Sequence, residues 1–277
     1  MPSLAQLSPA RYDDPLARID WRFIDRECWW LPPTALSLCG VPEFEALPLD
    51  ARRRLSHAEY AHLLQAGLWL ESLFMARLAS LAHRSADPAR RTRFLHELRE
   101  EAGHSLMFVE LLERSGFGVR APGAGTRFLN ALGQLLPGGS ALFWAIVVAA
   151  EELPDRLNRR LKRAVDDVTL SAVVYRMAQI HTRDEAVHAA FARTQCEQAA
   201  ARSPAWLRAL LAVPLSASIG LYARYVYFPP AWVYERAGLV PARRWRARAL
   251  ANQVRRAQVH DMLRPTLEFL RRSGWRV

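Results

Sequence analysis

The sequence predicts an all-α protein in which a bundle of four long helices is followed by further helices at the C-terminal end. Three observations predict this fold class. Apolar residues recur at helical spacing over four long segments, connections containing Pro and Gly separate these segments, and no segment alternates like a strand. The 277 residues, of which 51% are hydrophobic, are enough for one large core, so a single domain is expected.

The first 50 residues are predicted to form an extended lead-in that wraps over the body of the protein. They are rich in Pro and Trp and show no clear periodicity. The first long helix is expected to begin near Ser56, where Ser56 and Glu59 have the spacing of a capping box, and to end at about His83.

A single acidic residue lies in the apolar centre of this first helix. Between His62 and Arg77 the only charged residue is Glu71, and its neighbours at helical spacing are apolar. An unpaired charge on a buried face is costly. Glu71 is therefore expected to contact either a metal ion or a buried Arg.

The second long helix is expected from about 89 to 115, between the Asp87-Pro88 turn and Gly116. It carries Glu101 and His104 three residues apart, a spacing that places both side chains on one face. The surrounding stretch is polar, so a surface pair is the alternative interpretation of these two residues.

The third long helix is expected over about 140–164, after a connection rich in Gly and Pro and a short helix near 126–135. It begins uncharged and then presents Glu151 and Glu152, with Pro154 expected to kink it or to open a local bulge. Glu151 lies about 100° from the apolar line of this helix and Glu152 about 200°, which favours Glu151 as the inward-facing acid.

The fourth long helix, about 168–200, contains the stretch HTRDEAVH. At about 100° per residue, His181, Glu185 and His188 fall within roughly 60° of one another. Two imidazoles that bracket a carboxylate on one face are typical of a metal site. His181 taken alone is more typical of a residue that supports a ligand from behind.

Accessory helices are expected after this bundle. They are predicted near 205–226, 229–238 and 241–272, with breaks at Pro214, Pro229-Pro230 and Pro241. The apolar run 205–228 is interrupted by Arg208, Pro214 and Arg224, so no transmembrane segment is expected, although this run could touch a membrane surface.

Charge and cysteine content narrow the function classes. The net charge is +11, and residues 241–277 alone carry +8. This excess is almost entirely Arg and local, which indicates a solvated face, or docking of an acidic partner or substrate, rather than nucleic-acid binding. The three scattered cysteines and the absence of a secretory pattern at the N-terminus favour a cytoplasmic protein.

Taken together, the four long helices present the order Glu, Glu-x-x-His, Glu, Glu-x-x-His along the chain. This is the donor set of a two-metal carboxylate site, in which carboxylates bridge two cations and an imidazole terminates each. The candidate ligands are Glu71, Glu101, His104, Glu151 or Glu152, His181, Glu185 and His188. Glu100 and Asp184 are expected to accept hydrogen bonds from ligating histidines on neighbouring helices.

These motifs resemble those of the ferritin-like diiron carboxylate superfamily. REEAGH and RDEAVH are similar to the paired Glu-x-x-His motifs of ribonucleotide reductase small subunits and acyl-carrier-protein desaturases. The p-aminobenzoate N-oxygenase family, which oxidises arylamines to nitro compounds, adds a third histidine as His-x-x-x-Glu-x-x-His. His181, Glu185 and His188 have the same spacing, and the resemblance covers roughly residues 20–195.

The resemblance implies one ferritin-like diiron domain over residues 1–277, with a lead-in at 1–50, a metal-binding four-helix bundle at 56–200 and accessory helices at 205–277. It implies two iron ions, with manganese as an alternative, and a reduced cluster that binds O2 as a peroxo-diiron species. The metal ligands it implies are Glu71, Glu101, His104, Glu151, His181, Glu185 and His188, with no further catalytic residue assigned.

The function implied is N-oxygenation of an arylamine towards a hydroxylamine or nitro compound by an O2-dependent monooxygenase. A desaturase or C-hydroxylase with the same cluster is the nearer alternative, and a ferritin-like metal-binding protein without oxygenase turnover is the more distant one. The expected partners are O2, an electron donor, and a small amine or carboxylate substrate that could be bound to a carrier protein. A homodimer is also expected. A substrate pocket is expected to use Trp144, Phe191, Tyr222 and Tyr225, unless these aromatics belong to the core.

Overall fold

The computed structural model describes residues 14–164 and 168–277 and confirms the all-α class. Within these residues no strand occurs, and one isolated backbone bridge joins Trp29 to Leu170. Short 3-10 helices η1 (Leu16–Arg18), η2 (Trp21–Phe23) and η3 (Pro33–Ala35) come first. The α-helices are α2 (Pro42–Glu45), α3 (Leu49–Arg84), α4 (Pro88–Arg114), α5 (Ala124–Leu135), α6 (Ala141–Arg163), α7 (Ala172–Arg202), α8 (Ala205–Tyr227), α9 (Ala231–Arg236), α10 (Ala242–Ala251) and α11 (Gln253–Arg272).

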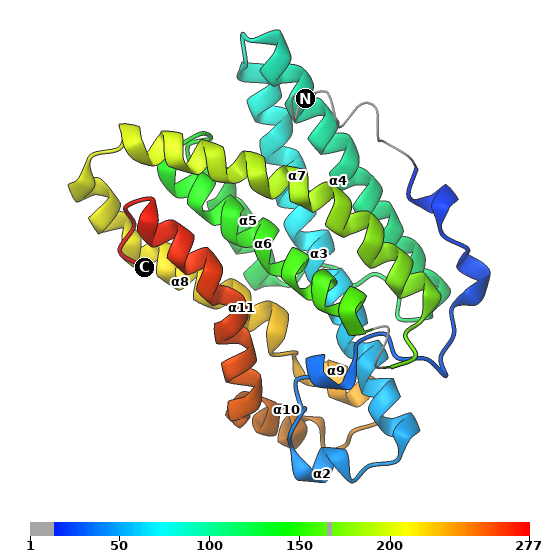
Figure 1. The fold of residues 1–277 in the computed structure, drawn as a ribbon. Helices are drawn as coiled ribbons and strands as arrows, with labels where there is room; N and C mark the ends of the chain where they lie inside the picture. The colour runs from blue at the N-terminus through cyan, green and yellow to red at the C-terminus, as the bar shows by residue number, and fades with distance from the viewer. Residues whose placement is uncertain (1–13, 165–167) are drawn as a thin grey trace.

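Four long helices form the bundle that the sequence predicts. Helix α3 packs along α4 and α6 packs along α7, and α4 also contacts α7 (Figure 1). Helices α8 and α11 pack against α6, whereas α9 packs against α3. The accessory helices therefore cover the α6 side of the bundle and its lower end in Figure 1.

Local sequence explains where two of the bundle helices begin. The Asp87 side chain accepts a hydrogen bond from the Ala89 backbone N–H at 3.0 Å, and Pro88 occupies the first position of α4, where no N–H is needed. The Ser140 hydroxyl accepts from the Phe143 backbone N–H at 3.2 Å at the start of α6. Helix α4 ends just before Gly116, which adopts a φ of 70° that suits glycine.

The predicted start of the first long helix near Ser56 is wrong. Helix α3 begins seven residues earlier, at Leu49, directly after Pro48. Ser56 is fully buried inside the helix, and its hydroxyl accepts hydrogen bonds from the backbone N–H groups of Trp30 (2.9 Å) and Leu31 (2.7 Å). The serine thus holds the lead-in against the bundle, and that role depends on residues 25 positions away.

The predicted single helix over 241–272 is also wrong. Two helices, α10 and α11, meet at Asn252, whose extended backbone conformation (ψ 110°) ends the first. The Asn252 amide donates to the carbonyls of Ser37 and Cys39 at 2.9 Å, and its oxygen caps Val254 N–H at 3.0 Å. Contacts with the lead-in therefore set this break. The predicted break at Pro214 is wrong, because α8 continues through this residue, and Pro265 likewise lies inside α11.

Helix α6 continues through Pro154, so this proline does not end the helix, and the kink or bulge expected there stays a prediction. Proline has no backbone N–H, so the carbonyl of Ala150, four residues earlier, lacks its helical partner. The Tyr222 hydroxyl on α8 lies 3.5 Å from that carbonyl oxygen. Pro154 thus leaves one acceptor in the middle of the bundle without a normal helical hydrogen bond.

Helix α8 exposes much of its apolar surface. Trp206, Leu210, Val213 and Leu221 are each at least 59% exposed. By length and composition alone, the stretch Ala205–Arg236 is apolar enough to cross a membrane, with 17% of its apolar window buried. The stretch contains two helices joined at Pro229-Pro230, and the absence of a transmembrane segment stays a prediction.

Candidate metal centre

The structure brings all seven predicted ligands together from α3, α4, α6 and α7. They form two groups, and within each group the donor atoms lie within 4.8 Å of one another. The first group is Glu71, His104 and His181, and the second is Glu101, Glu151, Glu185 and His188. All seven residues are at least 93% buried. Glu71 lies beside histidines, so it is not paired with a buried Arg. Glu101 and His104 are buried, so they are not a surface pair.

Two carboxylates lie between the groups. Glu185 Oε1 is 3.6 Å from His104 Nδ1, 3.6 Å from His181 Nε2 and 3.8 Å from His188 Nδ1. Glu101 Oε2 is 3.8 Å from His104 Nδ1, and its Oε1 is 3.0 Å from His188 Nδ1. Two donor atoms that share one metal are separated by about this much, because each bond is about 2.0–2.2 Å long. Glu101 and Glu185 therefore have the geometry of bridging ligands.

Glu71 and His181 belong to the first group alone. Glu71 Oε1 lies 3.7 Å from His181 Nε2 and 4.0 Å from His104 Nδ1. The arrangement suits one metal position beside Glu71, His104 and His181, and a second beside Glu151 and His188.

The buried donor atoms have the unmet valence that a metal would satisfy. Five of them make no hydrogen bond of normal geometry, although buried polar atoms normally make one, and Glu101 Oε1 and His188 Nδ1 instead form an ion pair with each other. These atoms are Glu71 Oε1, Glu101 Oε1, His104 Nδ1, Glu185 Oε2 and His188 Nδ1. Carboxylate and imidazole donors of this kind suit iron and manganese, so the donor set fits a dimetal site.

Acidic residues hold the outer nitrogens of two histidines, as the sequence predicts. His104 Nε2 lies 3.2 Å from Asp184 Oδ2 on α7, and His188 Nε2 lies 2.9 Å from Glu100 Oε2 on α4. When Nδ1 faces a metal, Nε2 carries the proton and donates it to the carboxylate. Each acid directly precedes the glutamate of one motif and accepts a hydrogen bond from the histidine of the other motif. The two motifs thus orient each other's histidines across α4 and α7.

Asn158 performs the same task for His181, and sequence reasoning missed it. Its amide nitrogen, Nδ2, lies 2.9 Å from His181 Nδ1. The ligating form of His181 carries its proton on Nδ1, and a 180° turn of the Asn158 amide group places its oxygen there to accept this proton. Asn158 follows Glu151 by seven residues on α6, and this two-turn spacing was the signal available in the sequence.

Burial and mutual contacts shift the acid–base properties of the centre. Burial raises the pKa of Glu71 to about 7. Burial and the neighbouring Glu185 carboxylate raise the pKa of Glu151 well above its usual value. Burial alone would lower the pKa of His104, but its hydrogen bonds with Asp184 and Glu101 outweigh burial and raise that pKa well above its usual value. Metal ions would take the place of these protons.

Glu152 is held away from the centre by basic residues. Its carboxylate accepts hydrogen bonds from Arg156 Nη2 (2.7 Å), Arg193 Nε (2.5 Å) and the Thr266 hydroxyl (2.5 Å). Burial acts to raise the pKa of Glu152, but these hydrogen bonds outweigh it and lower the pKa. Glu151, by contrast, belongs to the second donor group.

A matched pair of variants separates these two glutamates. We expect Glu151→Gln to lower the affinity for one of two metals by about tenfold or more, because a neutral amide replaces an anionic donor. Glu152→Gln should leave the metal content unchanged and lower the free energy of unfolding by about 1–3 kcal/mol. Metal analysis after dialysis and urea titration measure the two effects. Metal loss in Glu152→Gln with retention in Glu151→Gln would reverse the assignment.

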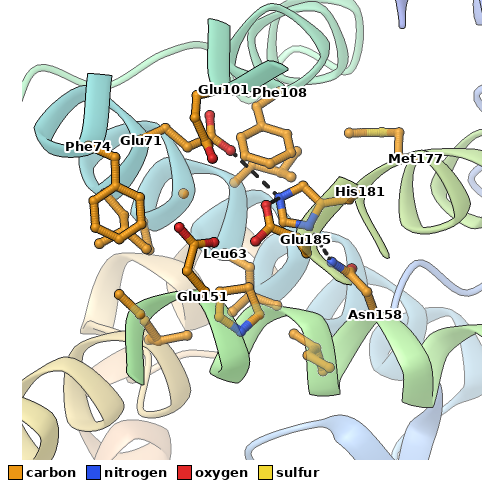
Figure 2. Close-up of a pocket in the computed structure, with 18 of the residues that line it drawn as sticks. Leu63, Glu71, Phe74, Glu101, Phe108, Glu151, Asn158, Met177, His181 and Glu185 are labelled. Atoms are coloured by element: carbon orange, nitrogen blue, oxygen red, sulfur yellow. Dashed lines mark hydrogen bonds and ion pairs between the residues drawn. The ribbon is translucent and has the colours of Figure 1, made fainter. Parts of the chain in front are cut away.

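A cavity of about 70 Å³ adjoins the centre, and Figure 2 shows Glu71, Glu101, Glu151 and Glu185 directed towards one space beside His181. Of the four aromatic residues expected there, Tyr222 lines this cavity. Trp144 and Phe191 pack against each other in the core at 5.7 Å between ring centroids. Tyr225 packs against Trp69 at 5.5 Å.

Comparison with known proteins gives three kinds of likeness. The family model described as p-aminobenzoate N-oxygenase AurF matches residues 1–274. Uncharacterized proteins of Mycobacterium tuberculosis and Mycobacterium bovis are each 26% identical over 197 residues, which is 69% of this chain. The chain spans 57% of the length of these curated relatives.

Solved structures share the fold at low sequence identity. A mutant R2-like ligand-binding oxidase with an aerobically reconstituted Fe/Fe cofactor superposes with a TM-score of 0.59 at 13% identity, covering 96% of this chain and 91% of that one. Another mutant of such an oxidase, with an anaerobically reconstituted Mn/Fe cofactor, gives a TM-score of 0.55 at 12% identity, covering 94% and 91%.

Proposed function

The chain belongs to the p-aminobenzoate N-oxygenase AurF family, and from that premise we propose that it is a dimetal oxygenase that uses O2 to oxidise the nitrogen of a small arylamine. The observation that carries the proposal is the place of His181. Its Nε2 lies 3.7 Å from Glu71 Oε1 and 3.6 Å from Glu185 Oε1, so it joins the first donor group as a third histidine of the centre.

In this proposal Glu71, His104 and His181 would hold one metal, and Glu151 and His188 would hold the other. Glu101 and Glu185 would be shared between the two ions. Four carboxylates balance the charge of two divalent ions, which makes a fully buried centre electrostatically tolerable. Two iron ions, or one manganese and one iron, would supply the redox chemistry that activates O2.

The remaining residues orient the ligands and keep the site dry. Asp184, Glu100 and Asn158 fix the ring directions of the three histidines through their outer nitrogens. The side chains that complete the cavity wall are mostly apolar. They would limit the access of water to the oxidising centre and favour a substrate of low polarity.

The test is a reaction of the reduced, iron-loaded protein with arylamines and isotopically labelled O2, read by mass spectrometry. The proposal requires labelled oxygen on nitrogen, as a hydroxylamine, nitroso or nitro product. Labelled oxygen on carbon would indicate a C-hydroxylase, and loss of two hydrogens from a fatty or amino acid would indicate a desaturase. Stable metal binding without any product from these substrate classes would indicate a metal-binding protein without turnover.

A further inference from the structure

We propose that the cavity beside the metal centre selects an uncharged, ring-sized amine and rejects free arylcarboxylates. This inference rests on the proposed function for the reaction, but the selectivity is a property of the cavity wall. It separates the substrate of this chain from the p-aminobenzoate named in the family description.

The first observation is that the described cavity wall offers no cationic side chain to pair with a substrate carboxylate. Among the described residues that line the cavity, none is Lys or Arg, and the one basic side chain, His181, belongs to the donor set. The wall already contains four carboxylates, from Glu71, Glu101, Glu151 and Glu185. Two bound divalent metal ions would balance these four negative charges. No positive charge would then remain to balance a substrate carboxylate.

The second observation concerns the rest of the wall. Apart from the donor set it is built from apolar residues, from Asn158 and from three tyrosines. The Asn158 amide is engaged with His181, and the Tyr227 hydroxyl donates to the Leu153 carbonyl at 2.9 Å. Arg255 stacks over the Tyr227 ring at 5.4 Å, but its Nε and Nη1 donate to the carbonyls of Tyr227 and Ala35.

An aminobenzoate in this cavity would therefore bury a charge without a partner. If its amine faces the donor set, the carboxylate lies one ring length away against the apolar wall. Loss of hydration without a compensating ion pair makes that placement unfavourable. A neutral group at the same position carries a much smaller penalty.

The third observation provides a site for the amine. Ala150 lines the cavity, and its carbonyl lacks a helical N–H partner because Pro154 stands four residues later. The Tyr222 hydroxyl approaches this oxygen only to 3.5 Å, at the limit of a hydrogen bond. Because a carbonyl oxygen has two lone pairs, it can accept an N–H from a substrate amine beside this long Tyr222 contact and hold the nitrogen beside Glu151.

Cavity size agrees with a single aromatic ring. At about 10–15 Å³ for each water-sized group, a cavity of about 70 Å³ holds about five to seven such groups. This is the scale of one aromatic ring, so the second substituent of a larger arylamine would lie against the cavity wall.

The main experiment compares the binding of two probes with the same shape, 4-aminobenzamide and 4-aminobenzoate. The protein is loaded with Mn²⁺, kept free of O2 and titrated by calorimetry at neutral pH. We expect the neutral amide to bind at least about tenfold more tightly than the carboxylate. Equal affinity, or tighter binding of the carboxylate, would overturn the proposal.

A charge-insertion variant tests the cause. Leu63 lines the cavity and is half-buried, so an Arg at this position can lie along the wall and present its guanidinium inside. Leu63→Arg should improve the binding of 4-aminobenzoate relative to the amide by about tenfold, whereas Leu63→Met should keep the wild-type preference. An unchanged preference in a folded Leu63→Arg protein would contradict the charge argument, and the wild-type comparison stands if this variant does not fold.

Aniline and toluene test the role of the Ala150 carbonyl. Pro154→Ala restores the helical N–H that this carbonyl lacks. The preference for aniline over toluene should then fall by about fivefold, the equivalent of one hydrogen bond. No change in this preference would remove the carbonyl from the proposal.

These binding results are independent of turnover. A protein that prefers the neutral probe but never oxidises an amine refutes the proposed function and leaves the cavity selectivity intact. A protein that binds and oxidises 4-aminobenzoate as well as its amide supports the function and refutes the selectivity.

Discussion

Glu185→Ala is expected to abolish the binding of both metals. Glu185 Oε1 lies within 3.8 Å of a nitrogen of all three histidines, so the variant removes one donor from each metal position. It also removes one of the four negative charges that balance two divalent ions in a fully buried site. His181→Ala should have a smaller effect, because His181 belongs to the first group alone, and about one metal per chain should remain.

Metal analysis of the purified variants after reconstitution with Fe²⁺ or Mn²⁺ measures this difference. Glu197→Ala is a matched control, since Glu197 is an exposed acid on the same helix and should leave about two metals per chain. The bridging assignment is wrong if folded Glu185→Ala still retains one metal, or if His181→Ala loses both.

Ser56→Ala is expected to lower the free energy of unfolding by about 2–4 kcal/mol, although Ser56 is not one of the proposed metal ligands. The substitution leaves the buried backbone N–H groups of Trp30 and Leu31 without their acceptor. It also removes the donor to the Leu31 carbonyl, at 3.0 Å. A buried donor that loses its partner costs about 1–3 kcal/mol.

Urea titration of the metal-free protein measures this loss. Ser72→Ala is the control on the same helix, because the Ser72 side chain is exposed and bonds the Trp69 carbonyl three residues back. Its expected effect is within about 0.5 kcal/mol. Equal effects of the two substitutions would show that Ser56 does not hold the lead-in.

The residues of the two donor groups could be predicted to lie together because their chemistry contradicts their surroundings. Glu71 is an acid in an apolar stretch, and Glu151 follows ten residues without charge. Only a partner in the fold explains a charge in such a place, and helical periodicity says which acids face inward. The choice of Glu151 over Glu152 as the acid that faces the donor group followed from an angle of about 100°.

Features that depend on distant contacts could not be predicted in the same way. The pattern of Ser56 and Glu59 matches a capping box, yet Ser56 binds the lead-in, and the Glu59 carboxylate accepts a hydrogen bond from the Ser37 backbone N–H at 3.0 Å. The break at Asn252 depends on the carbonyls of Ser37 and Cys39. The role of Ser56 and the break at Asn252 both depend on where the lead-in packs against the helices. The lead-in has no periodicity, so local helix propensity does not predict its position.

The crosswise support between α4 and α7 ties metal binding to the register of two helices. A slip of one residue along α7 would move its side chains by about 1.5 Å and turn them by about 100°. The contacts of His104 with Asp184 and of His188 with Glu100 would then break together. A misaligned bundle could still bury its apolar faces, but it could not assemble both donor groups. Metal binding would therefore stabilise only the bundle in which α4 and α7 have the correct register.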